Sequence, residues 1–376
     1  MAPRRIPFRL IFIGIVLIAL GAREIALEQR PSFLRPGLKL CAYVGNEGDG
    51  SVSVVDLVSL RVQATVPVGS GLSGLRAHPA RKEVWGVSTD GGYVWVLDAA
   101  SDKILARIPV GAGPYAVDFS ADGKRAYVAA SGANSVAAID CANRQVVARA
   151  RTGRNPRIAR VTPDGKSIVV ANRDDNALQV FDALTLTPRA TIPTASAPEQ
   201  VVILPDSSIA FVSASGQGQV SVVDLRRNSL LVNLPLPGKP GAMFLKPDGG
   251  ELYITVPEAH ELTVINTATH ELADSMLLGS MPAQGALDAG TLVLYVSDEA
   301  AGRVVSIDVA FRAPQQPVSV GARPGALALD PANPHDLLLA VDEGSNDLAV
   351  IRVRTKSLIT MIPVGNSPRD LAILLY

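Results

Sequence analysis

The sequence predicts an all-β fold, a single β-propeller of four-stranded antiparallel blades, because three kinds of residue recur along it every 42 positions. Large, mostly aromatic residues occur at Tyr43, Trp85, Tyr127, Val169, Phe211, Tyr253 and Tyr295. Aspartates occur at Asp56, Asp98, Asp140, Asp182, Asp224 and Asp308, with Asn266 in the remaining place of that series. Prolines occur at Pro114, Pro156, Pro198, Pro240, Pro282 and Pro324. Unrelated residue types that share one period indicate a repeated structural unit.

Residues 112–153 show the expected content of one unit. The alternation over 115–119 predicts a first strand, and Asp122-Gly123 predicts a tight turn because glycine accepts the positive φ that such turns need. Segments 126–130 and 135–140 predict the second and third strands, and 146–148 predicts the fourth. No helical periodicity interrupts them, so we expect one antiparallel blade.

Eight blades are expected from the ends of the fourth strands. These ends fall at Gly69, Gly111, Gly153, Ala195, Gly238, Gly279, Gly321 and Gly365. Residues 42–69 hold only a second, third and fourth strand, and residues 366–376 hold only a first strand. We therefore predict one composite blade made from both ends of the chain, which hides the open sheet edges. Seven blades with a surplus unit are the alternative.

The N-terminus resembles a targeting segment. Arg4, Arg5 and Arg9 precede an apolar run over residues 10–22, which matches a secretory signal better than the roughly 20 residues of a spanning helix. We predict a signal peptide or membrane anchor over 1–22, a linker over 23–39 and the propeller over 40–376. The protein is then periplasmic or extracellular, and an uncleaved anchor over residues 10–27 is the alternative.

The charge of the body argues against nucleic acid as a partner. Residues 40–376 carry 28 basic and 33 acidic side chains, whereas phosphate-backbone binding needs clustered lysine and arginine. We expect a monomer whose partner is a protein or a small molecule and whose membrane contact, if any, is the N-terminal anchor. Cys41 and Cys141 fall two blades apart, beyond the reach of a disulfide, so both are expected to be inert thiols.

A family resemblance emerges from the repeat itself. The pattern G-x-x-P, an Asp-Gly turn, the segment AYVAASGANSVAAID and the segment IPVG together resemble the YVTN-type β-propeller repeat over residues 40–376. The resemblance implies a superfamily that includes surface-layer and periplasmic propellers, lactonase-type enzymes and the eight-bladed, haem-binding propeller of cytochrome-cd-type nitrite reductases.

The candidate ligand site comes from positions that do not repeat. The residue after each crossover proline is large and polar at Tyr115, Arg157, Glu199 and Arg369, and small in the other units. Together with Arg173 and Gln200 from the same face, these residues predict a lopsided polar pocket in which arginines bind a carboxylate or phosphate and Tyr115 stacks. The alternatives are solvated loop residues, or an ion pair between Arg157 and Glu199 of neighbouring blades.

The aspartate series and the histidines give no metal site. Because an aspartate recurs in nearly every unit, we expect Asp56, Asp98, Asp140, Asp182, Asp224 and Asp308 to bind the backbone of the turns that follow them. His260, in a loop on the crossover side, is the one weak candidate ligand to a metal or haem iron. No C-x-x-C-H motif, zinc-type cysteine cluster or nucleophile elbow is present.

The sequence therefore favours an exported binding or scaffold protein that engages a small ligand or a protein partner, without a cofactor and without catalysis. The alternative is an enzyme or redox protein, either a lactonase-like hydrolase or a haem-binding propeller.

Overall fold

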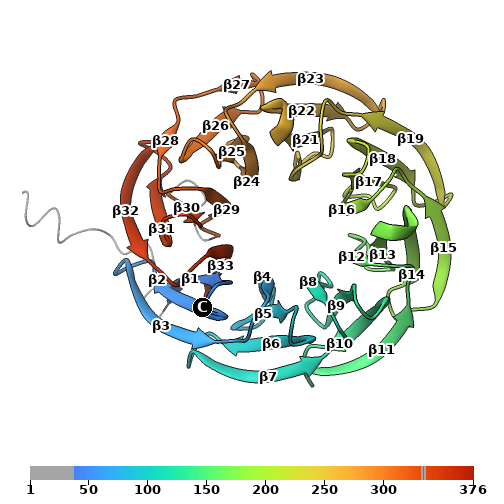
Figure 1. The fold of residues 1–376 in the computed structure, drawn as a ribbon, viewed down its shortest axis with the longest axis horizontal. Coiled ribbons are helices and arrows are strands. Elements are labelled where there is room, and N and C mark those ends of the chain that lie inside the picture. Colours follow the sequence, from blue (N-terminus) through green and yellow to red (C-terminus); the bar gives the residue numbers. More distant parts are fainter. Residues whose placement is uncertain (1–37, 332, 334–335) are drawn as a thin grey trace, which may run out of the picture. The chain divides into compact units, whose positions relative to one another are not determined.

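The computed structural model describes residues 38–331, 333 and 336–376. Eight antiparallel sheets follow one another around a ring (Figure 1). This confirms the all-β propeller and the count of eight, so the seven-bladed alternative is wrong. Residues 40–376 form one compact unit. The signal peptide or anchor over 1–22, and the linker over 23–39 except its last two residues, lie outside the described residues.

The first four blades contain strands with these bounds. Blade 1 holds β1 (Leu40–Asn46), β2 (Ser51–Asp56), β3 (Arg61–Pro67) and, from the other end of the chain, β33 (Pro368–Leu375). Blade 2 holds β4 (Leu72–Ala77), β5 (Glu83–Ser88), β6 (Tyr93–Asp98) and β7 (Lys103–Pro109). Blade 3 holds β8 (Pro114–Phe119), β9 (Arg125–Ala130), β10 (Ser135–Asp140) and β11 (Gln145–Arg151). Blade 4 holds β12 (Pro156–Val161), β13 (Ser167–Asn172), the 3-10 turn η1 (Arg173–Asp175), β14 (Ala177–Asp182) and β15 (Pro188–Pro193).

The other four blades continue in chain order. Blade 5 holds β16 (Pro198–Ile203), β17 (Ile209–Ala214), β18 (Gln219–Asp224) and β19 (Ser229–Pro235). Blade 6 holds β20 (Met243–Leu245), β21 (Glu251–Val256), the 3-10 turn η2 (Pro257–Ala259), β22 (Glu261–Asn266) and β23 (Glu271–Leu277). Blade 7 holds β24 (Pro282–Asp288), β25 (Val293–Asp298), β26 (Arg303–Asp308), β27 (Ala313–Pro314) and β28 (Val318–Ser319). Blade 8 holds β29 (Pro324–Leu329), β30 (Leu337–Asp342), β31 (Asp347–Arg352) and β32 (Ser357–Pro363).

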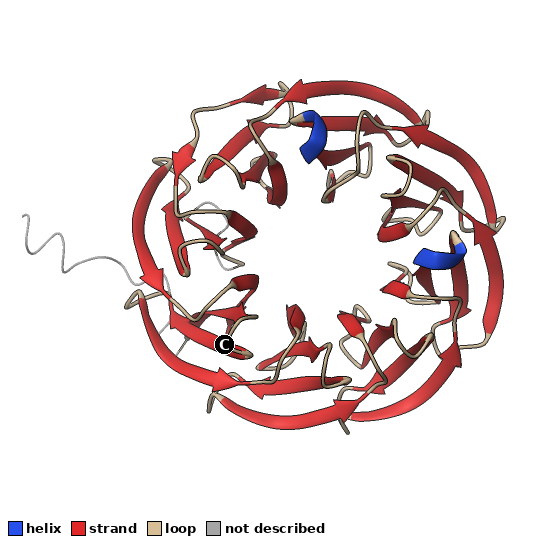
Figure 2. Cartoon of the chain, viewed as in Figure 1, coloured by secondary structure: helices blue, strands red, loops and turns tan. Residues whose placement is uncertain are grey.

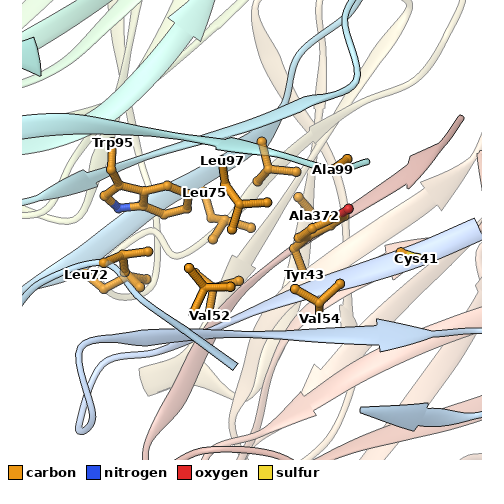
Figure 3. Close-up of a cluster of buried hydrophobic side chains, with 13 residues drawn as sticks. Cys41, Tyr43, Val52, Val54, Leu72, Leu75, Trp95, Leu97, Ala99 and Ala372 are labelled. Atoms are coloured by element: carbon orange, nitrogen blue, oxygen red, sulfur yellow. The ribbon is translucent and has the colours of Figure 1, made fainter. Parts of the chain in front are cut away.

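The hydrophobic core lies between neighbouring blades. The second and third strands are buried on both faces, and the large residues of the 42-residue series occupy the interfaces. Figure 3 shows one such interface, where Tyr43 and Val54 of blade 1 meet Trp95 and Leu97 of blade 2. Each fully buried large side chain contributes about 2 kcal/mol or more. A blade on its own lacks a covered face, so the ring must form as a whole.

The ring closes through the two ends of the chain, as the sequence predicted. β33 pairs antiparallel with β1, from Leu40 opposite Leu375 to Asn46 opposite Pro368. The Tyr376 hydroxyl lies 3.7 Å from Cys41 Sγ and extends the closure beyond the last strand. The pairing removes an edge that would otherwise recruit other chains.

The aspartates of the 42-residue series bind the turns between the third and fourth strands. Asp182 Oδ1 accepts hydrogen bonds from the backbone N–H groups of Leu184 and Thr185 at 2.9 and 2.8 Å. Asn266 accepts the equivalent two bonds through its amide oxygen. Equivalent bonds are accepted by Asp56, Asp98, Asp140, Asp224 and Asp308. These side chains therefore serve their own turns.

A buried polar clasp joins blades 2 and 3. Glu83, 4% exposed, accepts hydrogen bonds from Trp85 Nε1 at 2.9 Å and from Arg144 Nη2 of blade 3 at 2.6 Å. Burial alone would raise the pKa of Glu83, but these hydrogen bonds hold it below its usual value. The clasp recurs between blades 6 and 7, four units further along the chain, as Glu251, Tyr253 and Arg312.

Three blades depart from the strand lengths that the sequence indicated. In blade 3 the fourth strand covers Gln145–Arg151 and is longer than the expected 146–148, and it contains a bulge that the other blades with an unbroken fourth strand share. In blade 6 the first strand is short, because Gly238, Pro240 and Gly241 precede it and these residue types disfavour strand pairing. In blade 7 the outer strand is split into β27 and β28, and Pro317, which has no N–H, lies in the gap.

Among the described residues there is no disulfide, and Cys41 and Cys141 are both buried thiols. Burial raises the pKa of Cys141 to about 12, so this thiol is unreactive. The described part of the chain contains no helix with the length and apolar character needed to cross a membrane.

Candidate functional site on the crossover face

The connections between blades and the loops between second and third strands share one side of the ring, here called the crossover face. In blade 3 the N–H groups of Ser131 and Gly132 donate to the carbonyls of Gly113 and Ala112 at 2.9 and 3.0 Å. The turns η1 and η2, the two helical segments in Figure 2, are loops of this kind in blades 4 and 6.

Tyr115 and Arg157 form a stacked pair at the inner edge of this face. Pro114 faces Ala130 and Val117 faces Val128, so two residues of β8 stand against one of β9. Tyr115 lies in this bulge with 44% of its surface exposed. Arg157 has the same place in blade 4, and its guanidinium carbon lies 4.5 Å from the centre of the Tyr115 ring. Within the described residues, Arg157 forms no ion pair with a carboxylate.

Glu199 and Arg173 form a second pair beside the first. Arg173 Nε lies 3.1 Å from Glu199 Oε1, and the Ser215 hydroxyl donates to the same oxygen at 2.8 Å. Glu199 therefore pairs with Arg173 of the preceding blade, and the alternative in which it pairs with Arg157 is wrong. The Arg157 guanidinium stays available to a ligand.

Arg369 belongs to a different part of the face. Its Nη1 lies 2.9 Å from Glu47 Oε2 and its Nε lies 3.6 Å from Glu343 Oε1. Arg323 in turn forms ion pairs with Glu343 and with Glu299, so arginines and glutamates alternate along this part of the face. Arg369 thus joins the loops of blades 1 and 8 and is committed to two carboxylates.

In three of the other blades, the positions equivalent to Tyr115 and Arg157 carry small side chains or none. Gly241, Ala283 and Gly325 occupy the position that Tyr115 and Arg157 hold in their blades. Gln200 is half-buried, and its backbone N–H donates to the Ser213 hydroxyl at 3.0 Å. The residues after the crossover prolines therefore differ in size around the ring, with large side chains on some inner strands and small ones on others.

Four charged residues on neighbouring inner strands were missed by sequence reasoning, namely Arg76, Asp118, Arg160 and Asp370 on β4, β8, β12 and β33 (Figure 1). An inner strand is a sheet edge, so its N–H groups on the side of the ring axis need other acceptors. Asp370 Oδ2 accepts from the N–H of Leu75 at 2.7 Å, and Asp118 Oδ2 accepts from the N–H of Val161 at 3.1 Å.

The charges on these inner strands also act on each other. Arg160 Nη1 lies 3.3 Å from Asp118 Oδ1, while burial and then the charge of Arg76 lower the pKa of Arg160. Burial raises the pKa of Asp370. A usable sequence signal existed, because positions 76, 118 and 160 are charged whereas 202, 244, 286 and 328 hold Val, Phe, Ala and Ala.

His260 ends η2 in the left-handed conformation, with a φ of 61°. Its side chain is exposed, and its Nδ1 donates to the carbonyl oxygen of Ser280. That bond selects the tautomer in which Nε2 carries the lone pair, as in histidines that bind a metal or a haem iron. The described residues contain no cluster of three or more potential metal ligands, so a bare metal ion has no site of that type there.

Residues 82–214, about a third of the chain, match the family model described as "Cytochrome D1 heme domain". Among solved structures, the chain resembles dihydro-heme d1 dehydrogenase NirN in complex with DHE, with 18% identity and a TM-score of 0.77 over 91% of this chain and 77% of that one. Hydrazine synthase from Kuenenia stuttgartiensis shares 22% identity with a TM-score of 0.61, over 78% of this chain and 99% of that chain. Apo AztD from Citrobacter koseri shares 13% identity with a TM-score of 0.68, over 90% and 98%.

The structural likenesses show the propeller fold. None of these matches carries the YVTN label, and a search of curated proteins finds no significant match.

Proposed function

We propose that this chain is a haem-binding propeller, and that a haem of the d1 class binds at the inner edge of the crossover face. The observation that carries the proposal is the match of residues 82–214 to a haem-domain model, since that segment contains Tyr115, Arg157, Arg173 and Glu199. The proposal replaces the cofactor-free binding module favoured by the sequence.

The residues present suit such a ligand. Haems are flat and carry carboxylates, and the stacked pair offers an exposed aromatic ring together with a guanidinium that no described carboxylate neutralises. Arg157 would bind a carboxylate, Tyr115 would lie against the macrocycle, and His260 Nε2 would bind the iron. Bound haem would supply redox chemistry at its iron, while these three residues bind and orient it.

Reconstitution tests the proposal. Purified protein is titrated with hemin and with haem d1, and binding is followed by visible absorption and by retention of the haem after desalting. We expect the variants Tyr115→Ala and Arg157→Ala each to weaken binding about tenfold, the effect of losing roughly 1.4 kcal/mol of cation–π or charged hydrogen-bond energy. His260→Ala is expected to shift the absorption bands of the bound haem, because the iron would lose the imidazole nitrogen.

Arg227→Ala is the matched control. The Arg227 side chain is 80% exposed and lies in a turn on the side opposite the crossover face, so its loss should leave haem binding unchanged. Absence of retained haem with wild-type protein contradicts the proposal. Equal affinities for Arg157→Ala, Tyr115→Ala and the control contradict the placement of the site.

We further propose that the protein is exported, on the strength of the basic and apolar pattern of residues 1–22. A fusion of residues 1–39 to alkaline phosphatase, which is active only after export, tests this. An inactive fusion that accumulates in the cytoplasm would exclude export through this segment.

A further inference from the structure

A hollow of about 480 Å³ lies between blades 2 and 3, toward the outer rim of the crossover face. It is lined by Pro109 and Gly111 after blade 2, and by Ser135, Arg149, Ala150 and Arg151 of blade 3. In Figure 1 the strands that contribute these residues, β7, β10 and β11, lie outside the inner strands, so the hollow is separate from the Tyr115–Arg157 pair. Its volume is that of a small-molecule site.

Blade 3 departs from the repeat at this hollow. The position of Arg151 is proline in five units, at Pro67, Pro109, Pro193, Pro235 and Pro363. Blade 3 therefore has a long charged side chain where the typical unit has a small apolar one.

The position of Ser135 varies among the units and is serine also in blade 1, at Ser51. In blade 2 the corresponding Tyr93 donates its hydroxyl to the Val68 carbonyl at 2.8 Å and fills the space beside Gly69. Ser135 is only 6% exposed, its Oγ has no hydrogen-bond partner among the described residues, and it lines the hollow. An unsatisfied buried hydroxyl costs about 1 to 3 kcal/mol, so this position is one that a ligand atom would stabilise.

The charge at the hollow is positive. Arg149 is fixed in place by hydrogen bonds to the carbonyls of Val110 and Pro109. Arg151 is exposed, pairs opposite Ser135 across the two strands, and forms no ion pair within the described residues. No acidic side chain is among the lining residues. Two guanidinium groups and one hydroxyl thus surround an otherwise apolar hollow.

We propose that this hollow is a second ligand site, which binds a small organic anion. Its carboxylate or phosphate group lies against Arg151, Arg149 and the Ser135 hydroxyl, and its apolar body lies against Pro109. Arginine recognises both anionic groups in a bidentate manner, and the short side chain of Ser135, where blade 2 has Tyr93, supplies the room.

Isothermal titration calorimetry with phenyl phosphate and with benzoate tests the site, and neutral benzyl alcohol controls for purely apolar binding. We expect one of the two anions at least to bind, and benzyl alcohol to bind at least tenfold more weakly. The preferred anion identifies the ligand as a phosphate or a carboxylate.

Variants taken from the chain's own repeat then remove the site without introducing foreign packing. Ser135→Tyr fills the hollow with the residue of blade 2, whose Tyr93 occupies the corresponding space beside Gly69, and Arg151→Pro restores the usual proline. Each is expected to weaken anion binding at least tenfold, and neither should alter hemin titration. Arg107→Ala is the matched control, since Arg107 in blade 2 makes the equivalent backbone contact with Pro67 beside a position filled by Tyr93.

Two results overturn the proposal. One is that neither anion binds more tightly than benzyl alcohol. The other is that Ser135→Tyr and Arg151→Pro retain the wild-type affinity. Should either variant fail to fold, Ser135→Ala, which deletes only the unpartnered hydroxyl, decides the question by its affinity for the same anion.

Discussion

Asp342 and Asp347 form a buried acid pair in blade 8, and replacing Asp342 with Asn should stabilise the protein above neutral pH. Asp342 is fully buried and Asp347 is 8% exposed. Asp342 Oδ2 accepts from the N–H of Gly321 at 2.9 Å. Burial and then the hydrogen bond with Asp347 raise the pKa of Asp342 to about 8.

The sign of the pH effect follows from that shift. The folded protein holds a proton on Asp342 that the unfolded chain, with an aspartate pKa near 3.9, releases once the pH exceeds about 4. The contribution of Asp342 to the free energy of unfolding is therefore largest below pH 4, and it is lost as the pH rises through about 8. At roughly 1.4 kcal/mol per pH unit, the loss in free energy of unfolding has an upper bound of about 6 kcal/mol. We expect about 3 kcal/mol, because water that enters when Asp342 ionises solvates the charge.

Asn at this position retains both contacts. Its Oδ1 can accept from the N–H of Gly321 and its Nδ2 can donate to the side chain of Asp347, and the repeat itself uses Asn46 and Asn172 at the equivalent place. We expect Asp342→Asn to raise the Tm by about 3 to 5 °C at pH 8, taking about 1 to 2 °C per kcal/mol for a domain of this size. At pH 4 the two proteins should melt together.

Thermal melts of wild type and variant from pH 4 to 9 make the measurement. Asp347→Arg gives a second variant, because it copies the Asp298–Arg303 pair of blade 7, where two side-chain N–H groups of Arg303 approach Asp298 Oδ2 at 2.9 and 3.0 Å. A Tm difference that does not change between pH 4 and pH 8, or a variant less stable at pH 8, would refute the reasoning.

Other predictions follow from the closure, the turns and the clasps. Deleting residues 366–376 removes β33 and should abolish cooperative unfolding in a thermal melt, whereas replacing only Tyr376 with Phe should lower the Tm slightly. Asp56→Ala should cost about 1 kcal/mol in free energy of unfolding, and Asp56→Asn less than half of that, because Asn266 shows that an amide can bind the same turn; equal losses would contradict the role of the acceptor oxygen. Glu83→Ala should cost about 3 kcal/mol or more because Arg144 and Trp85 lose their buried partner, and Glu83→Ala melting like wild type would show that the clasp contributes nothing. Gly74→Ala should destabilise, since φ is +61° and the added Cβ would lie 2.5 Å from Ala116 Cα; denaturant titration measures it.

Much of the fold was predictable because the residues that define one blade recur in most of the other blades. The series of aromatic residues fixed the interfaces between blades, and the complementary ends of the chain fixed the composite blade and the count of eight. Strand ends were less predictable. β11 contains a bulge, and the outer strand of blade 7 is split near Pro317. Both features depend on the pairing between adjacent strands, which the residues of one strand do not specify.

The candidate site was predictable only in part. The non-repeating positions after the crossover prolines pointed to Tyr115 and Arg157, and that choice remains a prediction. The stacking of these two side chains, and the pairing of Glu199 with Arg173, could not be read from the sequence because they depend on how neighbouring blades meet. Arg369 looked equivalent to Arg157 in the sequence and is instead bound to Glu47 and Glu343.

By itself, the sequence determined the period, the blade and the way in which the ring closes, because those depend on residue types that recur at fixed spacing. Only the tertiary structure decided which charged groups neutralise one another and which remain available. Arg157, Arg369 and Arg151 are alike as residues, and they differ because the fold brings a tyrosine ring to the first, two carboxylates to the second and an open hollow to the third. The tyrosine and the two carboxylates lie at sequence separations that no local pattern in the chain records.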